Sequence, residues 1–154
     1  EGNKRWWEID LIDVSGRYIT NDIASAIGRV QLKKLSSIIA RRKTIWNIYQ
    51  EELKSVNWLE IPPEPLAECE SSYYLYWLKI KGNMRDHFAN YMIENGIYVT
   101  FRYYPLHKIS HYQNDSILPN SERVNEETIN IPIHQNISDR EVDYIIHTIR
   151  AYKS

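Results

Sequence analysis

The sequence predicts an α+β domain in which a small, mainly antiparallel sheet is covered by helices. Three observations support this prediction. Apolar residues recur at roughly helical spacing through residues 22–53, aromatic and β-branched residues gather in residues 73–81, and a helix-start signature stands at Ser138. Helical and extended segments thus alternate along one chain of 154 residues, a length that suits a single core.

The first predicted helix begins at Thr20-Asn21-Asp22, where capping side chains precede an acid in the first turn. A single helix from there to Leu53 would be about 50 Å long, whereas a domain of this size has a radius of gyration of about 15 Å. We therefore expect either one long helix or a broken helix pair, and we favour a break or kink near Ser36-Ser37. The first half is expected to pack on something that this chain does not supply.

The prolines at positions 62, 63 and 65 end the helical region. The other predicted elements begin with a lead-in strand or linker at 1–16, a strand at 73–81 that ends at Gly82-Asn83, and a helix at 85–94 that ends at Asn95-Gly96. A strand at 97–104 that ends at Pro105, a helix at 121–129 that begins with serine, and an extended segment at 131–133 follow. The last helix begins at Ser138 and Glu141, and its residues Val142, Ile145, Ile146 and Ile149 are expected to face inward. We divide the chain into residues 1–60, the lead-in strand and the helices, and residues 61–154, a small α+β domain.

Composition excludes several classes of protein. Nineteen basic and twenty acidic residues give a net charge of −1, which argues against binding to nucleic acid or a membrane surface through bulk charge. No apolar run approaches the roughly 18 residues of a spanning helix. The single cysteine, Cys69, excludes a disulfide scaffold and predicts a cytoplasmic protein. Twelve tyrosines and five tryptophans, against two phenylalanines, are typical of surfaces that bind a partner or ligand.

Motifs that by themselves specify a chemistry are absent from the sequence. His107 and His111 stand four residues apart, but Pro105 and the loop-like surroundings argue against a helical metal site, so no metal is expected. Two segments indicate a ligand site. Residues 15–22 combine a glycine turn, Arg17 and a helix N-terminus, a pattern that suits an anion although an ordinary capped helix also fits. Residues 102–107 place Arg, Tyr and His around a proline at a strand end.

The run Gly16-Arg17-Tyr18-Ile19-Thr20-Asn21-Asp22-Ile23-Ala24-Ser25-Ala26-Ile27-Gly28-Arg29-Val30-Gln31-Leu32 resembles the helix signature of the DegT–StrS sugar aminotransferases. Later landmarks follow in the family's order, from the strand at 73–81 through Tyr103, Pro105-Leu106-His107 and residues 131–134 to the closing helix. These enzymes are fold-type I proteins that depend on pyridoxal phosphate (PLP). The resemblance covers nearly the whole chain but only the later part of the family's sequence.

The resemblance implies the small domain of a fold-type I enzyme, without the large domain that carries the Schiff-base lysine. The catalytic residue is therefore expected to lie outside this chain, and the chain alone is expected to be inactive. Arg17, where relatives commonly have Asn or Lys, and Tyr18 are implied as contacts to the PLP phosphate across a homodimer interface. Arg102, Tyr103 and His107 are implied as contacts to a nucleotide-linked keto sugar, with Arg102 replacing a frequent His and Tyr104 a frequent Pro.

Three functions follow as alternatives. The first is the C-terminal part of an aminotransferase that moves an amino group, from glutamate, to the keto sugar. The second is a non-catalytic binding or dimerisation module, or a subunit that complements a lysine-bearing partner. The third is an RNA-binding α+β domain that stacks bases on strand aromatics, against which the near-neutral charge argues.

Overall fold

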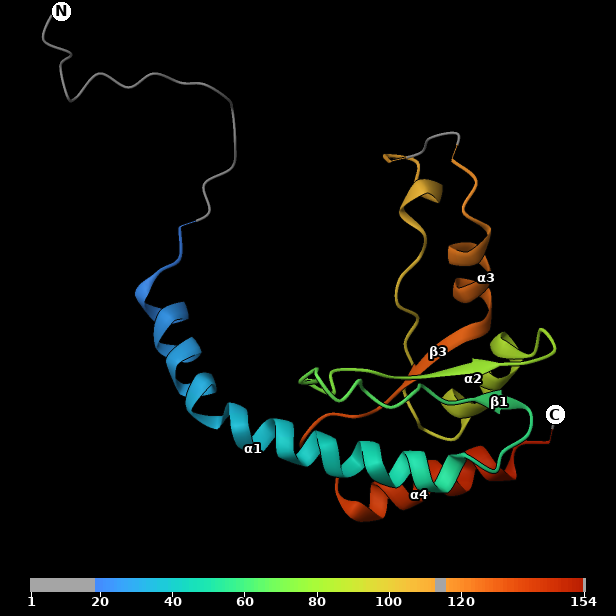
Figure 1. The fold of residues 1–154 in the computed structure, drawn as a ribbon, viewed down its shortest axis with the longest axis horizontal. Helices are drawn as coiled ribbons and strands as arrows, with labels where there is room; N and C mark the ends of the chain where they lie inside the picture. Colours follow the sequence, from blue (N-terminus) through green and yellow to red (C-terminus); the bar gives the residue numbers. More distant parts are fainter. Residues whose placement is uncertain (1–18, 113–115, 154) are drawn as a thin grey trace, which may run out of the picture. The chain divides into compact units, whose positions relative to one another are not determined.

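The computed structural model describes residues 19–112 and 116–153, and Figure 1 shows its fold. Its elements in chain order are α1 (Asp22–Leu53), β1 (Leu59–Glu60), β2 (Tyr76–Ile80), α2 (Arg85–Glu94), the short 3-10 helix η1 (Leu106–Lys108), α3 (Pro119–Glu127), β3 (Thr128–Ile131) and α4 (Asp139–Ala151). The chain divides into two units, Glu1–Lys34 and Leu35–Ser154. The α+β class expected from the sequence is confirmed. The predicted lead-in strand at 1–16 lies outside the described residues.

Helix α1 begins where the sequence predicted. The side chain of Asn21 caps it, since its Oδ1 accepts a hydrogen bond of 2.9 Å from the backbone N–H of Ala24. The helix is continuous for 32 residues, through Ser36 and Ser37. The predicted break is therefore wrong and the alternative of one long helix is confirmed, whereas a kink there stays a prediction. Serine lowers helix stability by only about 0.5 kcal/mol relative to alanine, and Ile38 and Ile39 continue the apolar repeat directly after it.

The sheet has three antiparallel strands in the order β1-β2-β3. Strand β2 pairs with β1 through Leu59 and Ile80 and with β3 through Tyr76 and Ile131. Alternate residues of β2 are buried, which matches a strand with one face on a core. The predicted strand at 73–81 is thus confirmed over its later part, whereas β1 was not predicted.

Two further predicted elements are corrected. The expected strand at 97–104 forms a single antiparallel bridge, between Thr100 and Asn130, beyond which residues 101–104 are exposed. The expected helix at 121–129 begins earlier, at Pro119, and gives way to β3 at Thr128. The proline suits the first turn of α3 because its missing N–H has no helical acceptor there.

The hydrophobic core of the second unit lies between the sheet and helices α1, α2 and α4 (Figure 1). The later part of α1 supplies Ile45, Trp46, Tyr49 and Leu53 to this core. From α4 come Val142, Ile145, Ile146 and Ile149, all of which the sequence placed inward, together with Thr148. The predicted capping box is confirmed, with Ser138 and Glu141 exchanging hydrogen bonds at the start of α4.

The earlier part of α1, in the first unit, has exposed apolar side chains. The exposed fractions are 75% for Ile23, 59% for Ile27 and 48% for Val30. Residues spaced by four and three positions share one face of an α-helix. Ile23, Ile27 and Val30 therefore form an exposed apolar face. That this half packs on something outside the chain stays a prediction. No described helix is long and apolar enough to cross a membrane.

Candidate functional site

The segment that follows α2 carries three of the predicted substrate contacts. Gly96 ends α2 with a φ of 73°, a left-handed conformation that glycine adopts without steric cost. Ile97 and Val99 are buried, and Thr100 exchanges backbone hydrogen bonds of 3.0 and 2.7 Å with Asn130. Beyond this bridge, residues 101–104 are exposed. The bridge therefore holds the start of an outward-facing segment in place.

The structure brings Arg102 and Tyr103 together with a third residue, Tyr74. Nη1 of Arg102 donates to the hydroxyl of Tyr103 at 3.0 Å and to the hydroxyl of Tyr74 at 3.2 Å. The hydrogen bond to Tyr103 raises the pKa of Arg102 and lowers the pKa of the Tyr103 phenol. The guanidinium therefore stays charged and has two phenol oxygens as neighbours.

Sequence reasoning missed Tyr74, which it treated only as part of a strand. The one sequence signal for an exposed tyrosine here was the Tyr73-Tyr74 pair just before β2. Adjacent side chains of an extended segment point to opposite faces, so one of the two would face away from the core. Tyr73 is half-buried and packs edge-on against Trp46 with ring centroids 5.5 Å apart. Tyr74 is 53% exposed and reaches Arg102 instead.

His107 lies in a different environment. It is 9% exposed, and its Nε2 lies 3.0 Å from Oε1 of Glu122, at the start of α3. Nζ of Lys108 lies 2.7 Å from the other carboxylate oxygen of Glu122. Together these contacts fix η1 against α3. A contact between His107 and a substrate stays a prediction, and so do the contacts of Arg102 and Tyr103.

The carboxylate of Glu122 is expected to make stability fall at low pH. Hydrogen bonds from Lys108 and His107 lower its pKa from 4.5 to about 2. Because the folded-state pKa is the lower one, this contribution is present above pH 4.5 and is lost as the pH falls through about 2. Urea unfolding from pH 7 to pH 2 should show a steeper loss for the wild type than for Glu122→Gln. Glu68→Gln, which changes an exposed carboxylate, should behave like the wild type, and an equal slope for Glu122→Gln would contradict the assignment.

Arg17 and Tyr18, the predicted cofactor contacts, lie outside the described residues. Among the residues that the structure does describe, no group of three or more His, Cys, Asp or Glu side chains suits a metal ion. Cys69 is free and exposed.

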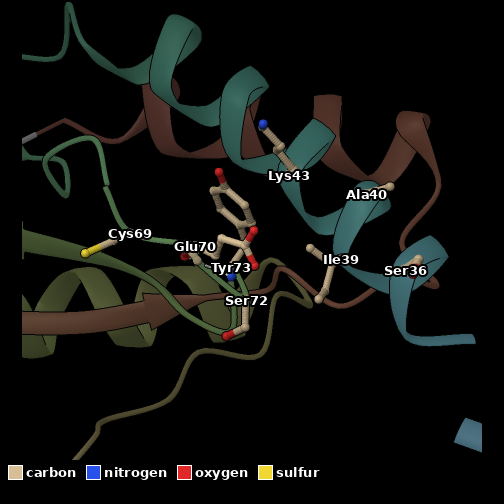
Figure 2. A pocket seen from close by; sticks show the side chains of 9 residues that line it. Ser36, Ile39, Ala40, Lys43, Cys69, Glu70, Ser72 and Tyr73 are labelled. Atoms are coloured by element: carbon tan, nitrogen blue, oxygen red, sulfur yellow. Dashed lines mark hydrogen bonds between the residues drawn. The ribbon is translucent and has the colours of Figure 1, made fainter. Parts of the chain in front are cut away.

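A pocket lies between α1 and the segment before β2, away from the predicted site residues (Figure 2). It measures about 570 Å³, and none of the predicted site residues lines it. One wall comes from Ser36, Ile39, Ala40 and Lys43 of α1, and the other from residues 69–73. The volume is sufficient for a small ligand. The pocket wall, however, contains an ammonium, a carboxylate and hydroxyl groups, so it favours neither an anionic nor a cationic ligand.

Comparison with known proteins places these features in a family. The model of the DegT/DnrJ/EryC1/StrS aminotransferase family matches residues 2–150. The chain belongs to this family. The family resemblance noted in the sequence is thereby confirmed.

Three similar proteins define how much of the family the chain represents. The dTDP-4-dehydro-2,3,6-trideoxy-D-glucose 4-aminotransferase of Saccharopolyspora spinosa is 39% identical over 92% of this chain and 37% of its own length. The crystal structure of the aminotransferase TlmJ from Streptoalloteichus hindustanus is 41% identical, with a TM-score of 0.86 over 95% of this chain and 40% of TlmJ. Spr1654 of Streptococcus pneumoniae, in its PLP form, is 29% identical, with a TM-score of 0.80 over 92% of this chain and 38% of that protein.

The chain therefore spans about two-fifths of the length of the aminotransferases that it matches.

Proposed function

We propose that this chain is the C-terminal part of a PLP-dependent aminotransferase that transfers an amino group, from glutamate, to a nucleotide-linked keto sugar. The observation that supports it most is the 39% identity to a dTDP-keto-sugar aminotransferase over 92% of this chain. The reaction would serve the biosynthesis of amino sugars. We place the enzyme in the cytoplasm, a location that suits the free Cys69.

PLP, when bound, supplies an electron sink for moving an amino group between carbon atoms. The lysine that holds PLP needs an amine that loses its proton readily. Lys108 does not fit this role, because its ion pair with Glu122 raises its pKa and keeps it protonated. Because the chain spans only about two-fifths of its relatives, we assign the lysine to a large domain outside this chain, and to this chain the phosphate contacts Arg17 and Tyr18.

We also infer that the large domain covers the apolar face of α1. Ile23, Ile27 and Val30 carry apolar area that the described chain leaves in water. In this arrangement the small domain would supply Arg102, Tyr103 and His107 to a substrate site shared with the large domain, in a homodimer.

A reconstitution experiment tests the proposal. The chain would be co-expressed with a lysine-bearing large domain and assayed for the visible absorbance of bound PLP and for amination of a dTDP-4-keto sugar with glutamate as donor. We expect both signals from the complex and neither from the chain alone. A chain that retains PLP by itself after borohydride reduction would contradict the proposal.

The same experiment separates the alternative, since the short span also suits a dimerisation module or a complementing subunit. A complex that binds PLP but never aminates the sugar would favour such a module. A complementing subunit is distinguished by the gene instead, since a large domain encoded in a separate reading frame would favour it.

Replacing Arg17 by alanine in that complex is expected to weaken PLP retention about tenfold, because a charge-assisted hydrogen bond to phosphate is lost. The measurement is the rate at which PLP leaves the complex during dialysis. Arg140→Ala, which removes an exposed positive charge at the start of α4, is the matched control. Unchanged retention by Arg17→Ala would remove Arg17 from the phosphate site.

A further inference from the structure

The pocket between α1 and the segment before β2 carries opposite charges on its two walls (Figure 2). Lys43 supplies an ammonium group from α1, and Glu70 supplies a carboxylate from the other wall. Both side chains are exposed, and among the described residues neither has a hydrogen bond or an ion pair. Each charge is therefore available to pair with an opposite charge on a ligand.

Three other lysines of the second unit already have a carboxylate partner. The ammonium groups of Lys54, Lys79 and Lys108 lie 2.6, 3.2 and 2.7 Å from glutamate oxygens. Lys43 and Glu70 instead line one open volume of about 570 Å³ without pairing across it. Ligand pockets typically measure about 300–1,000 Å³, so this volume holds a small molecule between the two charges.

The rest of the pocket wall is uncharged within the described part of the chain. Ile39 and Ala40 line it from α1, and the ring of Tyr73 lines it from the facing segment. Ser36 and Ser72 add hydroxyl groups, which can donate or accept hydrogen bonds. A ligand with one positive and one negative group therefore finds a partner for each, and the remainder of that ligand is expected to be apolar.

The Tyr73 wall is held in position by its neighbours. Tyr73 has a φ of 47°, a left-handed conformation that costs a residue with a side chain about 1 kcal/mol. Its ring packs edge-on against the buried Trp46, and its backbone N–H donates to Oγ of Ser71 at 3.1 Å. These contacts stabilise the conformation, so this side of the pocket is formed before a ligand binds.

We propose that this pocket binds the zwitterion of an α-amino acid with an apolar side chain. Lys43 pairs with the α-carboxylate, Glu70 pairs with the α-ammonium group, and the apolar side chain packs on the uncharged wall. A ligand with a single charge would leave Lys43 or Glu70 without a partner. Glutamate, the amino donor of the proposed reaction, would place its second carboxylate against apolar side chains and is expected to bind less well.

The test is a titration of the 154-residue chain, followed by NMR at the backbone amides of Ser72 and Tyr73. The probes are L-leucine, 4-methylpentanoate, which lacks the ammonium group, 3-methylbutylamine, which lacks the carboxylate, and L-glutamate, all at one pH and ionic strength. We expect L-leucine to bind with a dissociation constant of about 5 mM, because exposed ion pairs are weak. The other three probes should bind at least about fivefold more weakly.

Two variants assign each charge to its partner. Glu70→Gln should weaken L-leucine binding about fivefold and leave 4-methylpentanoate binding unchanged, because that probe has no ammonium group. Lys43→Gln should weaken both of these probes and leave 3-methylbutylamine binding unchanged. Glu68→Gln and Lys153→Gln, which change an exposed carboxylate and an exposed ammonium that do not line the pocket, are the matched controls. Amide signals of the buried core should stay in place in every variant, which shows that the fold is retained.

Two outcomes would overturn the site. One is the absence of a saturable shift with L-leucine, and the other is equal binding of L-leucine and either single-charge probe. Wild-type affinity for L-leucine in both Glu70→Gln and Lys43→Gln would overturn the assigned ion pairs. Each of these results leaves PLP binding and amination by the reconstituted complex untouched, so failure of this site is distinguishable from failure of the proposed function.

Discussion

Replacing Tyr49 by alanine is expected to lower the free energy of unfolding of this chain by about 4 kcal/mol. Tyr49 is fully buried, its ring centroid lies 5.0 Å from that of Tyr76, and its hydroxyl donates 2.8 Å to the carbonyl of Pro132. The substitution removes the ring from a closely packed core and leaves that carbonyl without its donor. Urea unfolding followed by circular dichroism measures the change.

Two further variants divide this effect. Tyr49→Phe keeps the ring and should cost about 1 kcal/mol, the net contribution of one hydrogen bond. Ile27→Ala, on the same helix but 59% exposed, should change the free energy of unfolding by less than about 0.5 kcal/mol. A loss for Ile27→Ala as large as that for Tyr49→Ala would show that the earlier part of α1 stabilises the isolated chain, contrary to our interpretation.

Three helix ends could be predicted from the sequence because each depends on local chemistry. Asn21 at the start of α1, Gly96 after α2, and Ser138 with Glu141 at the start of α4 satisfy backbone groups within a few residues of themselves. Such signals need no knowledge of the rest of the fold. All of these predictions are confirmed.

Strand pairing was harder to predict because it depends on residues far apart in the chain. Strand β3 begins at Thr128, inside a segment whose apolar spacing also fits a helix, and it becomes a strand by pairing with β2. Residues 97–104 have strand composition but find only Asn130 to pair with. The break expected at Ser36-Ser37 failed for another reason, since it assumed that α1 must stay within one compact body.

The candidate site likewise has a part that local sequence signals predict and a part that depends on contacts between distant residues. Arg102 and Tyr103 are adjacent, and their segment was recognisable from Pro105 and its flanking residues. Tyr74 stands 28 residues before Arg102 and meets it only through a tertiary hydrogen bond, which no local pattern reveals. His107 belongs to the recognised segment, yet its contact with Glu122 on α3 depends on tertiary packing.

Placing aspartate at both Ile23 and Ile27 is expected to abolish assembly with the large domain while leaving the chain itself folded. Each isoleucine would contribute about 2 kcal/mol if buried at an interface, and a carboxylate in its place adds the cost of burying an unpaired charge. Together these losses exceed about 4 kcal/mol, or roughly a thousandfold in affinity. Analytical ultracentrifugation of the co-expressed domains measures assembly, and urea unfolding of the isolated chain measures its stability.

Ser25→Asp is the matched control, because it places the same charge on the same exposed half of α1 but away from the apolar face. It should assemble like the wild type. The double variant should unfold at the same urea concentration as the wild type, since Ile23 and Ile27 are 75% and 59% exposed in this chain. Normal assembly of the double variant would show that the large domain does not cover this face. A selective loss of assembly would instead explain why a helix of 32 residues carries apolar side chains beyond the core that it helps to build.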